Sequence, residues 1–178
     1  MMCVVMRCLL DKNIVRYALA GLYYGQVRPL SPLEMGALTF WKMAEHQDLE
    51  LFISCYSFNV LQRLGDYDGI RILLAAMKVL SPTRYHARWA RRIRETSGLT
   101  REDAAMLALA TFGTDQEGGI LSTHYFVTYD QPLINGYRNH WDKLDRRFRA
   151  MTAQLPFPFS RAKLPSLRSP DSLIAEWL

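Results

Sequence analysis

Three aspartates in this 178-residue chain stand where carboxylates could act together. Asp11 ends an apolar run in CVVMRCLLDKNIV, Asp130 ends another in YFVTYDQPL, and Asp103 lies near the start of the clearest helix-like segment. Clustered carboxylates repel one another unless a cation neutralises them or some of them bind protons. Hard oxygen ligands suit Mg²⁺ and Mn²⁺, and the natural chemistry of such a site is metal-assisted attack of water on a phosphodiester.

Each aspartate also has a purely structural interpretation. Asp11 could cap the helix that follows it, and Asp103 could complete a capping box with Thr100. Asp130 could form an Asx turn before Gln131 and Pro132. A shared site explains the three positions better when they are taken together, because all of them fall where one crevice would lie, at the carboxyl ends of parallel strands.

Alternating strand and helix patterns would position these acids. Strands are expected at 3–10, 49–54, 77–80 and 125–128, and helices at 13–24, 31–46, 56–64, 68–75, 83–97 and 100–112. This alternation predicts an α/β fold with a mainly parallel sheet. If the first and fourth strands are neighbours, the three carboxylates can converge. From residue 156 the Pro-, Ser- and Arg-rich sequence predicts an extended tail that ends in a short helix.

Three segments resemble signatures of the PIN-domain nucleases. LLDKNIV resembles their opening LDTN signature, EDAAMLALATFG resembles their DALIAATAL helix, and FVTYD resembles their LVTxD strand end. The order and spacing of the segments match as well, over roughly Cys3 to Tyr137. The resemblance implies a PIN-like domain at 1–137, built as a three-layer α/β/α sandwich with a mainly parallel central sheet. The remainder, 138–178, would be a C-terminal extension with a basic helix and a Pro-rich tail.

The same resemblance implies an activity. Acidic residues in this family hold Mg²⁺ or Mn²⁺ for the hydrolysis of RNA phosphodiesters, and many members are toxins of toxin–antitoxin pairs. The chain would then be a divalent-metal-dependent endoribonuclease whose partners are RNA and an antitoxin protein. Asn13 and Thr128 would be supporting residues that orient the acids. The residues that match the catalytic and metal-binding positions are Asp11, Asp103, Asp130 and, as an additional metal ligand, Glu102.

One expected carboxylate is missing. The family has a Glu in the helix after the second strand, whereas the matching position in ISCYSFNVLQRL is Asn59 or Val60. Either Glu102 substitutes, with weaker metal affinity, or the chain is a catalytically degenerate PIN-like domain that binds RNA or a protein partner. A small phosphatase fits less well, because Asn13 stands where a DxD motif would have its second acid. Three further acids are close in sequence but on the wrong side of the strand: Glu45, Asp48 and Glu50.

Basic residues favour an anionic partner. The chain has 22 Lys and Arg against 17 Asp and Glu, a formal net charge of +5 and a pI of about 9.2. In RYHARWARRIR, Arg88, Arg91 and Arg92 would form an electrostatic track for RNA, with Trp89 partly covered. KLDRRFRAM, near the C-terminus, is a second basic helix. The alternative interpretation for both segments is a solvated helix face.

Cysteine usage and hydropathy favour a cytoplasmic protein without a membrane partner. Cys3, Cys8 and Cys55 lack metal-ligand spacing and are expected to be buried, reduced thiols. The N-terminal dozen residues show no long apolar segment, so no signal peptide is expected. No window reaches the roughly 20 apolar residues of a membrane span. The Met- and aromatic-rich segment 35–43 is assigned to the core or to a dimer surface, and a homodimer is the expected assembly.

Overall fold

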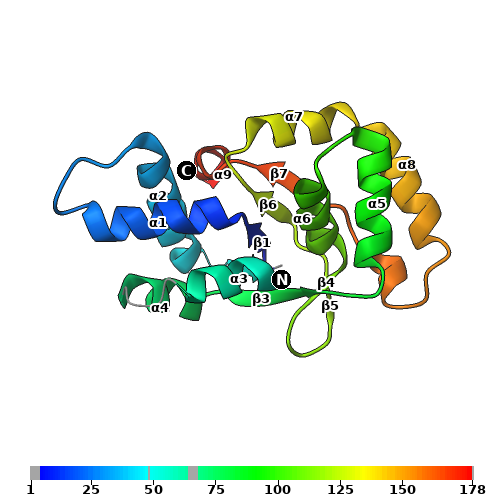
Figure 1. The fold of residues 1–178 in the computed structure, drawn as a ribbon, viewed down its shortest axis with the longest axis horizontal. Helices are drawn as coiled ribbons and strands as arrows, with labels where there is room; N and C mark the ends of the chain where they lie inside the picture. The colour runs from blue at the N-terminus through cyan, green and yellow to red at the C-terminus, as the bar shows by residue number, and fades with distance from the viewer. Residues whose placement is uncertain (1–4, 48, 64–67, 178) are drawn as a thin grey trace. The chain divides into compact units, whose positions relative to one another are not determined.

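A computed structural model describes residues 5–47, 49–63 and 68–177 of the chain. Within these residues, helices alternate with the strands of a seven-stranded sheet (Figure 1). The strands are β1 (Arg7–Leu10), β2 (Glu50–Ser54), β3 (Lys78–Pro82), β4 (Gly113–Thr114), β5 (Ile120–Leu121), β6 (Tyr125–Val127) and β7 (Ser166–Arg168). The predicted α/β class is therefore confirmed. Cys3 and Asp48 lie outside the described residues.

The strand order places the strands that precede Asp11 and Asp130 side by side. It runs β5-β4-β3-β2-β1-β6-β7, so β1 lies between β2 and β6. β1 and β2 are parallel, with Leu10 opposite Ile53. The antiparallel β3–β4 and β4–β5 pairs involve the two-residue strands β4 and β5. The first strand and the predicted fourth strand, β6, are thus neighbours.

The helices begin and end at the residues that local chemistry favours. Ser31 accepts a hydrogen bond from the Glu34 N–H at the start of α2 (Pro32–His46). Thr100 does the same for Asp103 at the start of α6 (Arg101–Phe112). Gly98 ends α5 at φ +67°, a left-handed conformation that favours glycine. None of the described helices is long and apolar enough to cross a membrane. The helices are α1 (Lys12–Tyr24), α2 (Pro32–His46), α3 (Cys55–Gln62), α4 (Asp68–Ala75), α5 (His86–Ser97), α6 (Arg101–Phe112), α7 (Gln131–Asn139), α8 (Trp141–Thr152), η1 (Phe159–Arg161) and α9 (Pro170–Trp177).

Contacts divide the chain into two compact units that interleave along the sequence. Unit 1 contains the described residues of Met1–Val79 together with Val127–Tyr129 and Arg168–Leu178. Unit 2 contains Leu80–Phe126 and Asp130–Leu167. Each unit has its own core.

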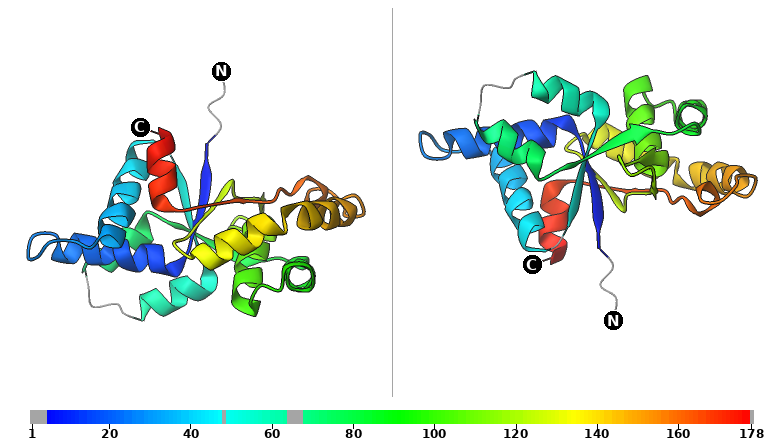
Figure 2. Two further views of the ribbon diagram at one scale, coloured as in Figure 1. Left: turned by 90° about the horizontal axis from the view of Figure 1, so that it is seen from above. Right: turned by 90° about the horizontal axis from the view of Figure 1, so that it is seen from below.

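The core of unit 1 is built around α2. This helix packs against α1 and against the C-terminal helix α9 (Figure 2). The fully buried Phe40 stacks on Trp177 of α9, with ring centroids 6.1 Å apart. Gly36 allows α2 to lie close to α9 and to Tyr129, because a Cβ at this position would collide with the Tyr129 hydroxyl and the Asp171 carboxylate. The C-terminal helix is therefore an integral part of this unit.

The core of unit 2 is centred on α5, which packs against α6 and α8. Trp89 of α5 is 0% exposed, and its ring lies 5.3 Å from that of Phe148 in α8. The prediction that Trp89 is only partly covered was wrong. An isolated α5 would leave the indole at the edge of its apolar face, and the second basic helix α8 covers it.

Two segments contain strands that the sequence did not predict. The segment expected to be an extended tail contains η1 and the strand β7. β7 borders β6: the Ser166 N–H donates to the His124 carbonyl at 2.9 Å and the Thr128 N–H to the Arg168 carbonyl at 3.0 Å. The second segment contains the two-residue strands β4 and β5, which were not expected and which pair with each other across the loop around Gly118. The predicted C-terminal helix is confirmed as α9.

The capping box of α2 predicts how stability responds to acid. Glu34 is 8% exposed, and its carboxylate accepts hydrogen bonds from Arg28 at 2.7 and 2.9 Å and from the Ser31 N–H at 2.8 Å. The Arg28 hydrogen bonds, then that of Ser31, lower the pKa of Glu34 to about 2. Because this pKa lies below the ordinary glutamate value of 4.5, the stabilisation is complete above that value and is lost as the pH falls toward 2.

We therefore expect the melting temperature of the wild type to fall more steeply between pH 5 and pH 2.5 than that of Glu34→Gln. The variant should also melt lower at pH 7, because Gln cannot pair with the Arg28 guanidinium. Thermal unfolding followed by circular dichroism at several pH values measures both effects. If the melting temperatures of the two proteins fell equally steeply between pH 5 and pH 2.5, the assignment of this acid sensitivity to Glu34 would be contradicted.

Candidate functional site

The carboxyl end of β1 brings two of the predicted site residues together. The Asp11 N–H donates to the Val127 carbonyl at 3.0 Å, which joins the end of β1 to the end of β6. The Thr128 hydroxyl donates to Asp11 Oδ2 at 2.9 Å, although the two residues are 117 positions apart. Thr128 is 0% exposed, so water does not compete for its hydroxyl. The carboxylate of Asp11 is thereby given a defined orientation.

Asp11 also has the structural role considered for it. It is the N-cap of α1, and its Oδ1 atom accepts a weak 3.4 Å hydrogen bond from the Asn13 N–H. Asn13 itself is exposed. The positive end of a helix dipole favours a negative charge at this position. A carboxylate at this strand end can therefore cap a helix and still face the edge of the sheet.

Two serines at the same edge of unit 1 were not anticipated from the sequence. Because Leu10 and Ile53 are opposite each other in parallel strands, Asp11 and Ser54 follow on the same side of the sheet. The buried Ser54 hydroxyl donates to Ser57 Oγ at 2.8 Å and accepts from the Ser57 N–H at 3.0 Å. The sequence signal was present, since Ser54 ends an apolar strand and starts a helix. These hydroxyls add polar groups to the strand ends that flank Asp11.

The other two predicted acids belong to unit 2, where each starts a helix. Asp103 forms a hydrogen-bond pair with Thr100, its N–H donating to Thr100 Oγ1 at 3.1 Å and its Oδ2 accepting from the hydroxyl at 2.6 Å. Asp130 is exposed, and its Oδ1 accepts from the Leu133 N–H at 2.9 Å at the start of α7. Glu102 is exposed in the first turn of α6. All three carboxylates lie at helix N-termini, where negative charge is favoured.

The predicted metal ligands are thus divided between the units, with Asp11 in unit 1 and Asp103, Asp130 and Glu102 in unit 2. Across residues 5–47, 49–63 and 68–177, no group of three or more His, Cys, Asp or Glu side chains is placed so that it could hold a metal ion. The oxygen donors themselves are of the type that Mg²⁺ and Mn²⁺ prefer. The structure therefore supplies suitable donors without assembling a three-ligand group from them.

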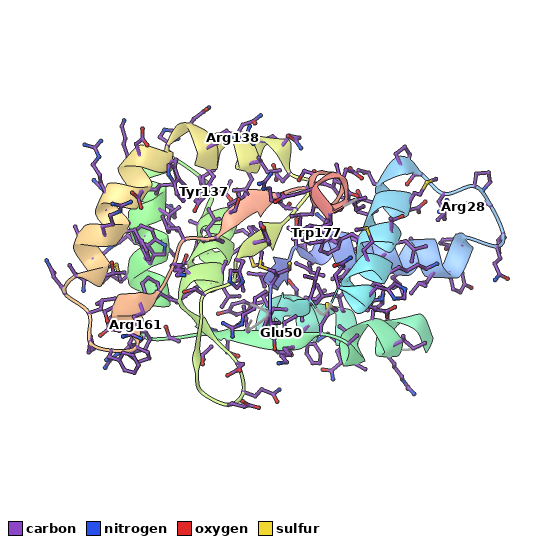
Figure 3. All side chains as sticks on the ribbon, turned by 180° about the vertical axis from the view of Figure 1, so that it is seen from behind. Arg28, Glu50, Tyr137, Arg138, Arg161 and Trp177 are labelled. Carbon is purple, nitrogen blue, oxygen red and sulfur yellow. The ribbon has the colours of Figure 1, made fainter. Side chains whose placement is uncertain are left out.

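Within the described part of the chain, Glu50 does not take the place of the Glu expected in α3. Asn59 and Val60 are both exposed there. Glu50, labelled in Figure 3, lies at the start of β2, the opposite end of this strand from Ser54. It accepts hydrogen bonds from Arg7 at 3.0 Å and from Lys78 at 2.6 Å. The hydrogen bond from Lys78, then that from Arg7, lowers the pKa of Glu50. The sequence-based placement of Glu50 on the wrong side of the strand agrees with this geometry.

The predicted RNA-contacting arginines all lie on α5 in unit 2. Arg88 and Arg91 are exposed, and Arg92 is half-buried. Arg91 Nε lies 3.8 Å from Glu95 Oε1 on the same helix. Such an exposed pair contributes about 0–1 kcal/mol, so it leaves the charge of Arg91 available to an anionic ligand.

Thr128→Val should lower Mn²⁺ affinity by about 10- to 100-fold if Asp11 is a metal ligand, the usual effect of losing a group that orients a ligand. Valine has nearly the same volume as threonine, but it cannot donate to Asp11. Mn²⁺ titration by calorimetry measures the effect. Thr39→Val, at an exposed position of α2, is the matched control and should bind Mn²⁺ like the wild type. Equal affinities for Thr128→Val and the control would contradict a metal-orienting role for Thr128.

No family model matches the sequence, and no curated protein matches it.

Proposed function

We propose that this chain is a PIN-like, divalent-metal-dependent ribonuclease that hydrolyses RNA phosphodiesters. The proposed fold is the three-layer α/β/α arrangement of that family. The proposed metal-binding and catalytic residues are Asp11, Asp103 and Asp130, with Glu102 as a further ligand. A toxin role, with an antitoxin protein as partner, a homodimeric assembly and action in the cytoplasm are parts of the same proposal. A small antitoxin-like gene beside this one would support the toxin role.

The observation that carries the proposal is the contact between Asp11 and Thr128. These residues come from LLDKN and FVTYD, two of the segments that resemble the PIN-domain signatures, and the fold joins them by a 2.9 Å hydrogen bond. A buried threonine that fixes a carboxylate at the carboxyl end of a strand suits a ligand-orienting role. β1 and β6 are neighbours in the sheet, which is the condition on which the expected convergence of the acids depended.

The donor chemistry supports the choice of ion. Carboxylate oxygens are the usual protein ligands of Mg²⁺ and Mn²⁺. When bound, such an ion supplies charge neutralisation at the scissile phosphate and a more acidic water. The acidic residues of this chain would contribute the negative charge. Thr128 and the N-terminal ends of α1, α6 and α7 would orient the carboxylates.

A catalytically degenerate PIN-like domain that binds RNA or a protein partner is the second candidate. Two observations favour it. The position expected to supply a Glu is occupied by the exposed residues Asn59 and Val60, and Glu50 is paired with Arg7 and Lys78 instead. In this alternative the chain has the same fold and the same Asp11–Thr128 contact, but it does not hydrolyse RNA.

An RNA cleavage assay separates the candidates. Purified chain is incubated with a fluorescently labelled single-stranded RNA in Mn²⁺, and in parallel with excess EDTA. The proposal predicts cleavage in Mn²⁺ that EDTA abolishes. Binding without cleavage would support the degenerate domain, and cleavage that persists in EDTA would contradict a metal-dependent nuclease. An Asp11→Asn preparation, purified identically, controls for contaminating nucleases.

A further inference from the structure

The positive charge of the chain is concentrated on two helices of unit 2. Helices α5 and α8 together carry eight Lys and Arg side chains against three acidic ones, an excess of five. The whole chain has a formal net charge of +5, so the remaining residues are balanced. His86, at the start of α5, adds no charge near neutral pH, because burial lowers its pKa. The net charge is therefore a property of one part of the surface.

The two helices lie against each other and form a groove. α5 and α8 are in contact and run side by side in Figure 1. The groove has a volume of about 460 Å³, and its lining comprises Glu95, Thr96, Lys143, Arg146, Arg147 and Ala150. The α8 residues of this set occupy successive turns of one face, so Lys143 lies about one turn, roughly 5.4 Å along the axis, from Arg146 and Arg147. We name this surface the α5–α8 groove.

Aromatic side chains pack beneath the α5–α8 groove, and ion pairs of Glu95 link its two helices. Trp89 and Phe148 pack together in the core between the helices. Glu95 lies 3.7 Å from Arg147 Nη1 and 3.8 Å from Arg91 Nε, so one carboxylate links cations of both helices. Among the described residues, no carboxylate lies within ion-pair distance of Lys143 or Arg146, both of which are exposed. Their charges are available to a ligand.

We infer that the α5–α8 groove binds the phosphodiester backbone of single-stranded RNA. Neutralising phosphates with Lys and Arg releases counterions, which gives affinity without base recognition. The groove lining, within the described part of the chain, offers cations and a hydroxyl but no aromatic ring for base stacking. Binding should therefore depend strongly on salt and weakly on sequence. The choice of RNA rests on the proposed function, whereas the recognition of phosphates rests on the groove alone.

The test is fluorescence anisotropy with a labelled 20-nucleotide RNA in EDTA, over a range of salt concentrations. Lys143→Gln/Arg146→Gln removes two charges without disturbing the Glu95 pairs. Two lost phosphate contacts should reduce the salt slope by about 1.4 and weaken binding roughly 25-fold at 0.1 M salt. Lys42→Gln/Arg63→Gln, two exposed positions in unit 1, is the charge-matched control and should bind like the wild type. Thermal melting checks that both variants are folded.

The outcomes separate this inference from the nuclease proposal. If both double variants weaken RNA binding equally, or if neither does, the inference is overturned, even where the wild type cleaves RNA in Mn²⁺. If only the groove variant loses affinity, the inference stands, even where no cleavage is seen. A polyglutamate peptide that competes as well as unlabelled RNA would point to an acidic protein partner and overturn the inference.

Discussion

Asp11→Asn is expected to lower Mn²⁺-dependent RNA cleavage on the order of 100- to 1000-fold, a typical loss when one preorganised electrostatic group is removed. The substitution removes the carboxylate charge and keeps the shape of the side chain. Asn is as good an N-cap as Asp when its side-chain oxygen accepts from the Asn13 N–H. Its amide NH₂ then faces the Thr128 hydroxyl and can donate to it, which reverses the direction of that hydrogen bond. We therefore expect the free energy of unfolding to change by less than about 0.5 kcal/mol.

Two measurements make this prediction specific. Cleavage rates are compared at saturating Mn²⁺, and stability is measured by urea unfolding. Asp11→Ala, which removes both the charge and the cap, should lose activity equally and also about 0.5–2 kcal/mol of stability. If Asp11→Asn keeps more than half of the wild-type rate, Asp11 acts only as a helix cap. If it unfolds, its loss of activity says nothing of a metal.

Trp89→Ala is expected to destabilise the chain by about 3–5 kcal/mol, a large part of the 5–15 kcal/mol typical of a whole domain. Trp89 is 0% exposed and packs against Phe148, so truncation would leave a large cavity between α5 and α8. The same packing supports the α5–α8 groove. We therefore expect RNA affinity to fall together with stability in this variant.

Trp89→Phe is the matched control. The indole Nε1 is buried and, among the described residues, has no hydrogen-bond partner. Phe keeps an aromatic ring and removes this buried N–H, whose desolvation costs about 1–3 kcal/mol when no partner is present. The Phe variant should therefore lose much less stability than the Ala variant. Urea unfolding measures both, and a loss below about 1 kcal/mol for Trp89→Ala would contradict the described packing.

Local sequence signals predicted much of the fold. Ser31, Thr100 and Gly98 act at helix ends as their types predict, because capping depends on a few neighbouring residues. The apolar runs before Asp11 and Thr128 became neighbouring strands. The hydrogen bond between these two residues follows from that neighbourhood and from the side chains that the strands end with.

Features that depend on contacts between distant segments of the chain could not be predicted from local sequence patterns. β7 forms from a Pro- and Ser-rich segment with little strand character, because β6 offers it a hydrogen-bonding edge. Trp89 is covered by α8, which lies more than 50 residues away in sequence. The interleaving of the two units also has no local signal, because short segments such as Val127–Tyr129 join unit 1 only through tertiary contacts.

The central claim is that Asp11, Asp103 and Asp130 hold a divalent metal ion. Calorimetric titration of the purified chain with Mn²⁺ tests it most directly, with Asp103→Asn as the comparison. Because Asn cannot supply the carboxylate charge, the variant should lose the binding that the wild type shows. Saturable Mn²⁺ binding by the wild type, abolished in Asp103→Asn, is the predicted result. No binding by the folded wild type, or undiminished binding by the variant, would contradict the claim.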